Sequence, residues 1–437
     1  MTTRPGPRTR RALAAVASGA AALGLAACSA TSDLSAVGSS SSDATSVVGA
    51  ASSEMLSSTD LAALDTHVDD DDLEWSTDDE QTISLSDDDP TVSIDAGGVY
   101  RISGTITDGQ LVVTAPDDET VTLILDGATI TSSAGPAISI VSADEVTVYL
   151  EEGSDNALTD GSGYEVTDDA TPVAALASAS DLTIAGDGAL AVTGTTNDGI
   201  STKDGLAILA GDITVDAADD AVRGKDYVTV TGGTLTLTSG GDAVKSDNAE
   251  DADRGWVLVS AGTLAIEAGD DGIDAERAVE VTGGEVTISE SVEGIEAQDV
   301  IVTGCTVDVT ASDDGMNATA ASTDEESEAS DQGGPGGGGG GGGEADDGSQ
   351  LVISGGTVTI DAAFDGLDSN GSVSLTGGDI TITSAANGGD SPVDANGEAT
   401  LDGATLTANG TAISSLDELG GGMGGGGMRG GPPAQGA

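Results

Sequence analysis

The chain has 437 residues, with 12 Lys and Arg against 77 Asp and Glu, which gives a formal net charge of −65. A negative charge of this size excludes direct binding to the phosphates of nucleic acids. Aromatic residues make up only 2% of the chain but hydrophobic residues make up 37%, so we expect an aliphatic, layered core rather than a wholly disordered acidic chain.

The N-terminus has the pattern of an exported bacterial protein. Four arginines, Arg4, Arg8, Arg10 and Arg11, precede an uncharged run of small and apolar residues over 12–27. This pattern predicts a secretory signal peptide over residues 1–27. The run ends in Leu-Ala-Ala followed by Cys28, which is similar to a bacterial lipobox, and we expect lipidation of Cys28 and anchoring at the outer face of the membrane. The alternative is cleavage at a small-residue site beside an incidental Cys28.

Three segments have the composition of flexible chain. Residues 28–72, rich in Ser, Ala, Thr and Asp, are predicted to form a tether, and they contain the only histidine, His67. A Gly-rich insert over residues 320–348 and a Gly-rich tail over residues 416–437 are expected to be disordered. After removal of the signal peptide, Cys305 is the only free thiol candidate; we interpret it as a packed turn residue and expect no disulfide within the chain.

Between these segments a short motif, an acidic residue followed by Gly or Ala and then an aliphatic residue, recurs along the chain. Its first residues are Asp198, Asp220, Asp242, Asp271, Glu293, Asp314 and Asp365. The steps between them are 22, 22, 29, 22, 21 and 51 residues. The step of 29 contains an extra acidic segment over residues 247–253, and the step of 51 contains the Gly-rich insert. The underlying repeat is therefore about 22 residues.

Each repeat also carries a Thr-Gly-Gly turn followed by alternating apolar and polar residues, as in residues 230–237 and 281–288. Period-two alternation with β-branched residues predicts strands, and the glycine pairs predict tight turns. Short strands in a repeat of about 22 residues, without a helical stretch, predict an all-β parallel β-helix over residues 73–415. A β-sandwich is the competing fold, because turn signals every 8 to 12 residues also suit it.

Stacking of the coils would place the motif carboxylates above one another at about 4.8 Å, the spacing of neighbouring strands. Like charges at that distance repel by roughly 3.5 kcal/mol per pair at an effective dielectric of 20. Ca²⁺, which prefers several carboxylate and carbonyl oxygens, would offset this repulsion. The predicted Ca²⁺ ligands are Asp220, Asp242, Asp247, Asp271, Asp274, Asp314, Asp365 and Asp368. Glu296 and Asn317 share the column of Asp274 and Asp368. The alternative is a solvated acidic row without metal.

Basic residues cluster within the acidic chain. Lys203, Arg223, Lys225 and Lys245 fall in successive repeats, with Arg223 and Lys245 in one column and Lys203 and Lys225 in another. Such a cluster is either paired with neighbouring aspartates or directed at an acidic ligand, and an exposed ion pair is easily exchanged for a ligand carboxylate. Trp256 is a further candidate, because its indole could stack on a sugar; the alternative is that it is a partly buried residue of the solenoid.

The segments Asn197 to Asp204, Arg223-Gly224-Lys225-Asp226 and Lys245 to Asn248, with Asp365 to Gly371, resemble a family of bacterial carbohydrate-binding domains. The resemblance runs from about residue 98 to 410. It implies a right-handed parallel β-helix similar to pectate lyases, binding cellulose-like and acidic pectin-like polysaccharides, with bound Ca²⁺ and no established catalysis. The chain departs from the pattern at Ser391-Pro392, where the motif should recur near Asp390.

Three functions fit these features. The first is an extracellular, lipid-anchored, monomeric protein that binds acidic or cellulosic polysaccharide with the help of Ca²⁺. The second is a pectate-lyase-like eliminase, in which Ca²⁺ would acidify the proton beside a uronate and Arg223 or Lys245 would serve as the base. The third is a calcium-stiffened wall stalk or adhesin that binds no sugar.

Overall fold

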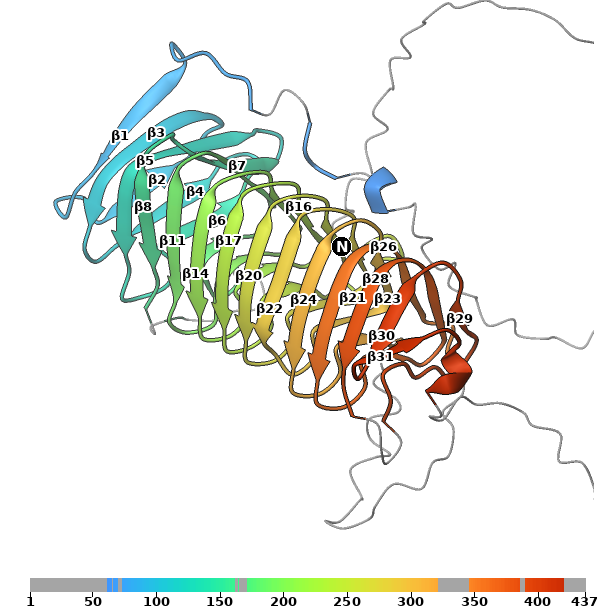
Figure 1. Ribbon diagram of the computed structural model, residues 1–437. Helices are drawn as coiled ribbons and strands as arrows, with labels where there is room; N and C mark the ends of the chain where they lie inside the picture. Colours follow the sequence, from blue (N-terminus) through green and yellow to red (C-terminus); the bar gives the residue numbers. More distant parts are fainter. Residues whose placement is uncertain are drawn as a thin grey trace, which may run out of the picture. The chain divides into compact units, whose positions relative to one another are not determined.

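The structure, a computed structural model, describes residues 61–64, 66–69, 73–161, 164, 171–320, 346–385 and 390–419. Strands of successive coils pair in parallel and in register; Val222 pairs with Val244, for example, and Val244 with Ile273. Figure 1 shows the coils following one another from β1 to β29. The predicted all-β parallel β-helix is confirmed, and its strands form three stacks that share one interior.

The stack that carries the acidic motif is here named the motif stack. It contains β2 (Thr91–Ile94), β4 (Gln110–Thr114), β6 (Ile138–Ser142), β9 (Ala174–Ser178), β12 (Asp198–Thr202), β15 (Val222–Gly224), β18 (Val244–Ser246), the first parts of β21 (Ile273–Val281) and β23 (Ile295–Val302), β25 (Met316–Ala318) and β27 (Leu367–Ser369).

The second stack is here named the strap stack, because an N-terminal segment that includes Leu61 and His67, described below as the strap, lies against it. It contains β1 (Glu80–Leu85), the first parts of β3 (Gly98–Ile106) and β5 (Val121–Thr131), β7 (Glu145–Leu150), β10 (Asp181–Gly186), β13 (Gly205–Ile208), β16 (Tyr227–Val230), β19 (Trp256–Val259), the second parts of β21 and β23, the first parts of β26 (Gln350–Ala362) and β28 (Ser372–Thr383), and β29 (Ala399–Leu401).

The third stack contains the second parts of β3 and β5, β8 (Asp155–Thr159), β11 (Ala189–Gly194), β14 (Asp212–Ala217), β17 (Thr234–Ser239), β20 (Thr263–Ala268), β22 (Glu285–Glu290), β24 (Thr306–Ala311), the second parts of β26 and β28, β30 (Thr405–Ala408) and β31 (Thr411–Ile413). Its last pair, β30 and β31, is antiparallel.

The alternating sequence explains which side chains fill the interior. In β17, the Leu235 and Leu237 side chains are buried while the threonines between them are exposed. Leu235 pairs in register with Ile213 and Leu264 of the neighbouring coils, so equivalent apolar residues form continuous columns. Because successive side chains of a strand point to opposite faces, the same alternation places a polar row on the outside of the third stack.

In the coils that carry glycine at the second motif position, such as those of Gly272 and Gly294, the close approach of the neighbouring coil requires it. A Cβ atom on Gly272 would lie 2.6 Å from the carbonyl oxygen of Gly294, and a Cβ atom on Gly294 would lie 2.3 Å from that of Gly315. These distances are shorter than a van der Waals contact allows, so any side chain would push the coils apart. The repeated Asp-Gly pair thus marks the corner where each coil turns into the motif stack.

The described residues 61–64 and 66–69, here named the strap, are folded against the solenoid. The 3₁₀ helix η1 (Leu61–Ala63) buries Leu61 in a cluster with Tyr227 and Trp256. The backbone amide of His67 donates to the Tyr227 hydroxyl at 2.7 Å, and its Nε2 lies 2.8 Å from the Thr183 hydroxyl. These residues are therefore packed against the folded body, whereas the sequence predicts a flexible tether over residues 28–72; the remainder of residues 28–72 lies outside the described residues.

Two other predicted boundaries also move. The 3₁₀ helix η2 (Leu416–Glu418) buries Leu416 against the core, so the folded body extends beyond residue 415. At the end of the Gly-rich insert, the Asp347 carboxylate accepts the backbone amides of Ala320 and Ser349 at 3.0 and 2.9 Å, which ties residue 347 to the solenoid. The predicted signal peptide, Cys28, most of the insert and the tail from residue 420 lie outside the described residues.

Among the described helices, none has the length and apolar character needed to cross a bilayer. The buried Cys305 matches its interpretation as a packed residue, and burial raises the pKa of its thiol.

Candidate functional site

A row of acids stands at the corner before the motif stack and is here named the turn-acid row. It consists of Asp198, Asp220, Asp242, Asp271, Glu293, Asp314 and Asp365. In most coils the carboxylate accepts the backbone amide of its counterpart in the next coil: Asp220 accepts from Asp242 at 3.0 Å, and Asp242 from Asp271 at 2.9 Å. The row therefore has a structural role, because each acid satisfies an amide that the turn would otherwise leave unpaired.

A second row follows three positions later, on the outer face of the motif stack, and is here named the ladder row. It reads Ser201, Arg223, Lys245, Asp274, Glu296, Asn317, Asp368 and Asp394, each beside the next in the paired strands. The turn-acid row continues beside it through these coils. Along the solenoid, the ladder row thus changes from basic to mainly acidic side chains, whereas the turn-acid row beside it is acidic throughout.

In the basic part of the ladder row, each cation is held by carboxylates. Arg223 is bonded to Asp247 and lies 3.8 Å from Asp198, while Lys245 is bonded to Asp242 and lies 3.1 Å from Asp274. Burial opposes the charge on Lys245, but Asp242, Asp274 and Asp220 outweigh it and raise the pKa of the amine. The pKa of Arg223 is also raised. A general base must be unprotonated in order to accept a proton, and the raised pKa values of Lys245 and Arg223 favour their protonated forms in this structure.

In the acidic part, three carboxylates converge, and among them only Asp274 has an ion pair with a described basic side chain, Lys245, at 3.1 Å. Oxygens of Asp271, Asp274 and Glu296 all lie within 4.8 Å of one another. Burial, followed by neighbouring carboxylates, raises the pKa of Glu296 to about 9, and burial also raises the pKa of Asp271 to about 7 and that of Asp274 to about 6. The raised pKa values indicate that three ionised carboxylates are disfavoured here even with Lys245 beside Asp274, and either protons or a further cation would relieve the repulsion.

A second convergence lies farther along the ladder row. Oxygens of Asp365, Asp368 and Asp394 lie within 4.8 Å of one another. Burial raises the pKa of both Asp365 and Asp368 to about 7. Between the two groups, the Asn317 amide donates to Glu293 at 3.0 Å, while its Oδ1 atom is buried without a hydrogen-bond partner in the described part of the chain. Carboxylate and amide oxygens of this kind are ligands that Ca²⁺ prefers.

The structure brings five of the eight predicted metal ligands into such groups. Asp242, with Asp270 and Asp271, forms a third group whose oxygens lie within 4.8 Å of one another. The predicted ligands Asp220 and Asp314 lie outside these groups and accept backbone amides of the next coil. Asp247 is bonded to Arg223 instead. Ca²⁺ binding itself stays a prediction.

The remaining predicted ligand contacts differ in their exposure. Lys203 is exposed, and Lys225 lies 3.8 Å from Glu250 at the surface. Trp256 is completely buried: its ring stacks on Tyr227 with centroids 4.7 Å apart, and both lie in the cluster that contains Leu61 of the strap. Trp256 is thus a buried residue of the solenoid, which is the alternative to a sugar-stacking role, and the strap contributes to the cluster that encloses its ring.

Comparison with known proteins decides the family. Residues 88–334 match a family described as carbohydrate-binding domain-containing protein, which is more than half of the chain. The chain belongs to this family. The matched residues include the basic part of the ladder row and the group formed by Asp271, Asp274 and Glu296, so these features lie within the carbohydrate-binding family domain.

Two similar proteins match parts of the chain. A carbohydrate-binding domain-containing protein of Acetivibrio thermocellus is 42% identical over 128 residues, which cover 29% of this chain and 45% of the relative. The chain therefore spans less than half of that relative. A solved structure, described as a polysaccharide lyase-like protein from C. thermocellum in a gadolinium derivative, is 33% identical; the match covers 53% of this chain and 96% of that one, with a TM-score of 0.46.

Proposed function

We propose that this carbohydrate-binding protein is exported, lipid-anchored at Cys28, and binds acidic, pectin-like polysaccharide through Ca²⁺ held on the ladder row. The observation that carries the proposal is the exchange of Lys245 for Asp274 and Glu296 along one row. Where Lys245 is present, its amine compensates Asp242 and Asp274. For Asp271 and Glu296, in the next coils, the described residues supply no such ion pair, so we propose that a cation from solution compensates them.

Ca²⁺ would also explain how so acidic a protein could bind a uronic-acid polymer. At a net charge of −65, direct association of two polyanions is repulsive. A Ca²⁺ ion takes six to eight oxygen ligands. If each of three carboxyl groups donates one oxygen, at least three coordination positions remain, and a uronate could occupy them. A row along the axis of the solenoid suits a linear polymer, because successive coils repeat the same ligands.

The test uses the full chain with Cys28→Ala, which would be released from the membrane, and measures retention on polygalacturonate with Ca²⁺ or with chelator. We expect retention only with Ca²⁺, and its loss in the double variant Asp274→Asn, Glu296→Gln. The matched control is Glu285→Gln with Asp308→Asn, which removes two exposed acids from the third stack of the same coils.

Retention that is equal in chelator, or equal in the two double variants, would contradict the proposal. Retention on no polymer, with a melting temperature that Ca²⁺ still raises, would instead favour the stalk.

A further inference from the structure

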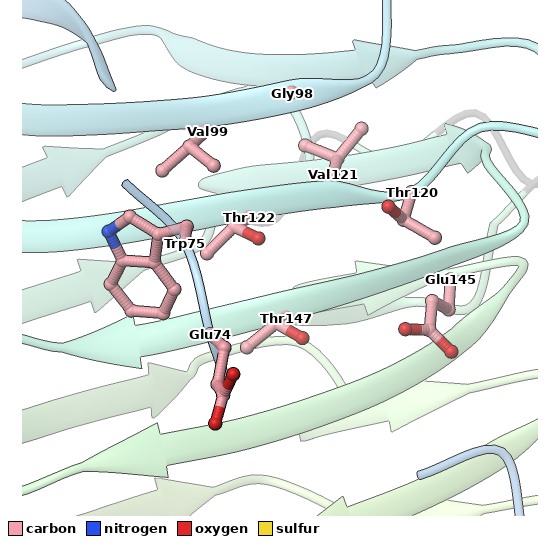
Figure 2. Close-up of a pocket in the computed structure, with 9 residues that line it drawn as sticks. All are labelled: Glu74, Trp75, Gly98, Val99, Thr120, Val121, Thr122, Glu145 and Thr147. Atoms are coloured by element: carbon pink, nitrogen blue, oxygen red, sulfur yellow. The ribbon is translucent and has the colours of Figure 1, made fainter. Parts of the chain in front are cut away.

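A pocket of about 350 Å³ lies on the outer face of the strap stack near its first coils, away from the ladder row. The side chains that line it include Glu74, Trp75, Thr120, Thr122, Glu145 and Thr147. Figure 2 shows the Trp75 indole at one end of this group and Glu145 at the other, with Thr122 and Thr147 between them. Thr122 and Thr147 are register partners in β5 and β7, so the repeat itself aligns their hydroxyl groups.

The indole of Trp75 is held in place before any ligand arrives. Its Nε1 donates to Glu80 at 3.2 Å, and its ring meets Tyr149 edge-on with centroids 4.9 Å apart. Glu80 is fixed by Arg101, whose Nε donates to it at 2.7 Å; this hydrogen bond is the main cause that lowers the pKa of Glu80. Because Trp75 is only partly buried, an ordered aromatic surface faces the pocket.

The pocket combines an apolar ring with hydroxyl groups and carboxylates, and no basic side chain lines it. A pyranose ring has an apolar face that can lie on an indole and hydroxyl groups that can donate to carboxylates. Two glutamates would repel a uronate, which makes a neutral sugar the better match. This chemistry differs from that of the ladder row, where acids and cations dominate.

We propose that this pocket binds a neutral pyranose unit of a glycan, independently of Ca²⁺ and of the ladder row. Glu74 and Trp75 precede residue 88, where the family match begins, so the pocket is built partly from residues outside the matched domain. The same chain would then hold neutral and acidic sugars on two different stacks.

The chain offers an intrinsic probe, because it contains only two tryptophans and Trp256 is completely buried. Cellohexaose and mannohexaose are titrated into the full Cys28→Ala chain in chelator while tryptophan fluorescence is recorded. We expect a saturable change with at least one of these neutral oligosaccharides and none with trigalacturonate.

Affinity is then compared by calorimetry for two variants and one control. Trp75→Ala should weaken binding by about tenfold or more, as loss of a central aromatic contact does. The double variant Thr122→Val, Glu145→Gln removes polar groups with little change in shape and should also weaken binding. Phe364→Ala removes an exposed aromatic ring that does not line the pocket and should have no effect.

The proposal is overturned if neither neutral oligosaccharide changes the fluorescence, if trigalacturonate produces the same change, or if the double variant binds as tightly as the control. Retention on polygalacturonate with Ca²⁺ is measured on the same preparations. If retention on polygalacturonate persists while the pocket binds no neutral sugar, the function proposed for the ladder row stands independently of the pocket.

Discussion

Replacement of Lys245 by Gln tests whether a cation is needed at each level of the ladder row. The amine lies 3.1 Å from Asp274 and is also bonded to Asp242. At 3.1 Å and an effective dielectric of 20, the first pair alone is worth about 5 kcal/mol before desolvation. The side chains of Lys245 and Asp274 are about one-quarter exposed, at 26% and 24%, so we place the loss between exposed and buried pairs, at about 2 to 3 kcal/mol.

For roughly 300 ordered residues, this loss corresponds to a fall in melting temperature of about 4 °C. The assay is thermal unfolding of the Lys245→Gln variant in chelator and in Ca²⁺. Because Gln leaves Asp242 and Asp274 without their ion pairs to Lys245, Ca²⁺ should restore most of the lost stability. The matched control is Lys225→Gln, whose contact with Glu250 is longer, at 3.8 Å, and more exposed. The reasoning is refuted if both variants lose the same stability, or if Ca²⁺ restores none to Lys245→Gln.

Three further predictions concern other parts of the chain. In chelator, the raised pKa of Glu296 means that the folded protein binds more protons than the unfolded chain between pH 4.5 and about 9. The free energy of unfolding should therefore fall as the pH rises through this range. In melting curves recorded over this pH range, the variant Glu296→Gln should show a smaller fall. Cys28→Ala should abolish incorporation of labelled palmitate and release the protein into the medium, whereas Cys305→Ala should leave both unchanged. Leu61→Ala should weaken the strap by about 3 kcal/mol, seen as faster amide hydrogen exchange over residues 66–69; unchanged exchange would count against the strap.

The solenoid could be predicted because its evidence is local and repeated. A 22-residue step, alternating apolar residues and glycine at one corner define a coil without knowledge of distant contacts. The strap could not be predicted in this way. His67 and Tyr227 are 160 residues apart, and Leu61 lies in an acidic and Ser-rich stretch whose composition is typical of a linker. The contacts of Leu61 and His67 become apparent only in the folded structure, which places Tyr227 of β16 and Trp256 of β19 beside them.

The candidate site shows the same division. The repeat predicts which residues share a row, and Arg223 and Lys245 are indeed neighbours. It does not predict which carboxylates converge: Asp220 and Asp247 are occupied by other partners, and Asp394 was missed because Ser391-Pro392 interrupts the motif just before it. Trp75 was missed because it lies outside the repeat, although its position beside Glu74 and ahead of β1 was visible in the sequence.

The strap also determines where tension would enter the solenoid. A force applied to the chain before residue 61 would act first on Leu61, which is buried beside Trp256. It would act next on His67, which is bonded to Tyr227, and only then on β1. These contacts would be broken one after another, as in peeling, whereas the parallel strands of the coils would not yet be strained. Detachment of these few side chains would lengthen the chain ahead of β1 under force while the coils of the solenoid stay folded.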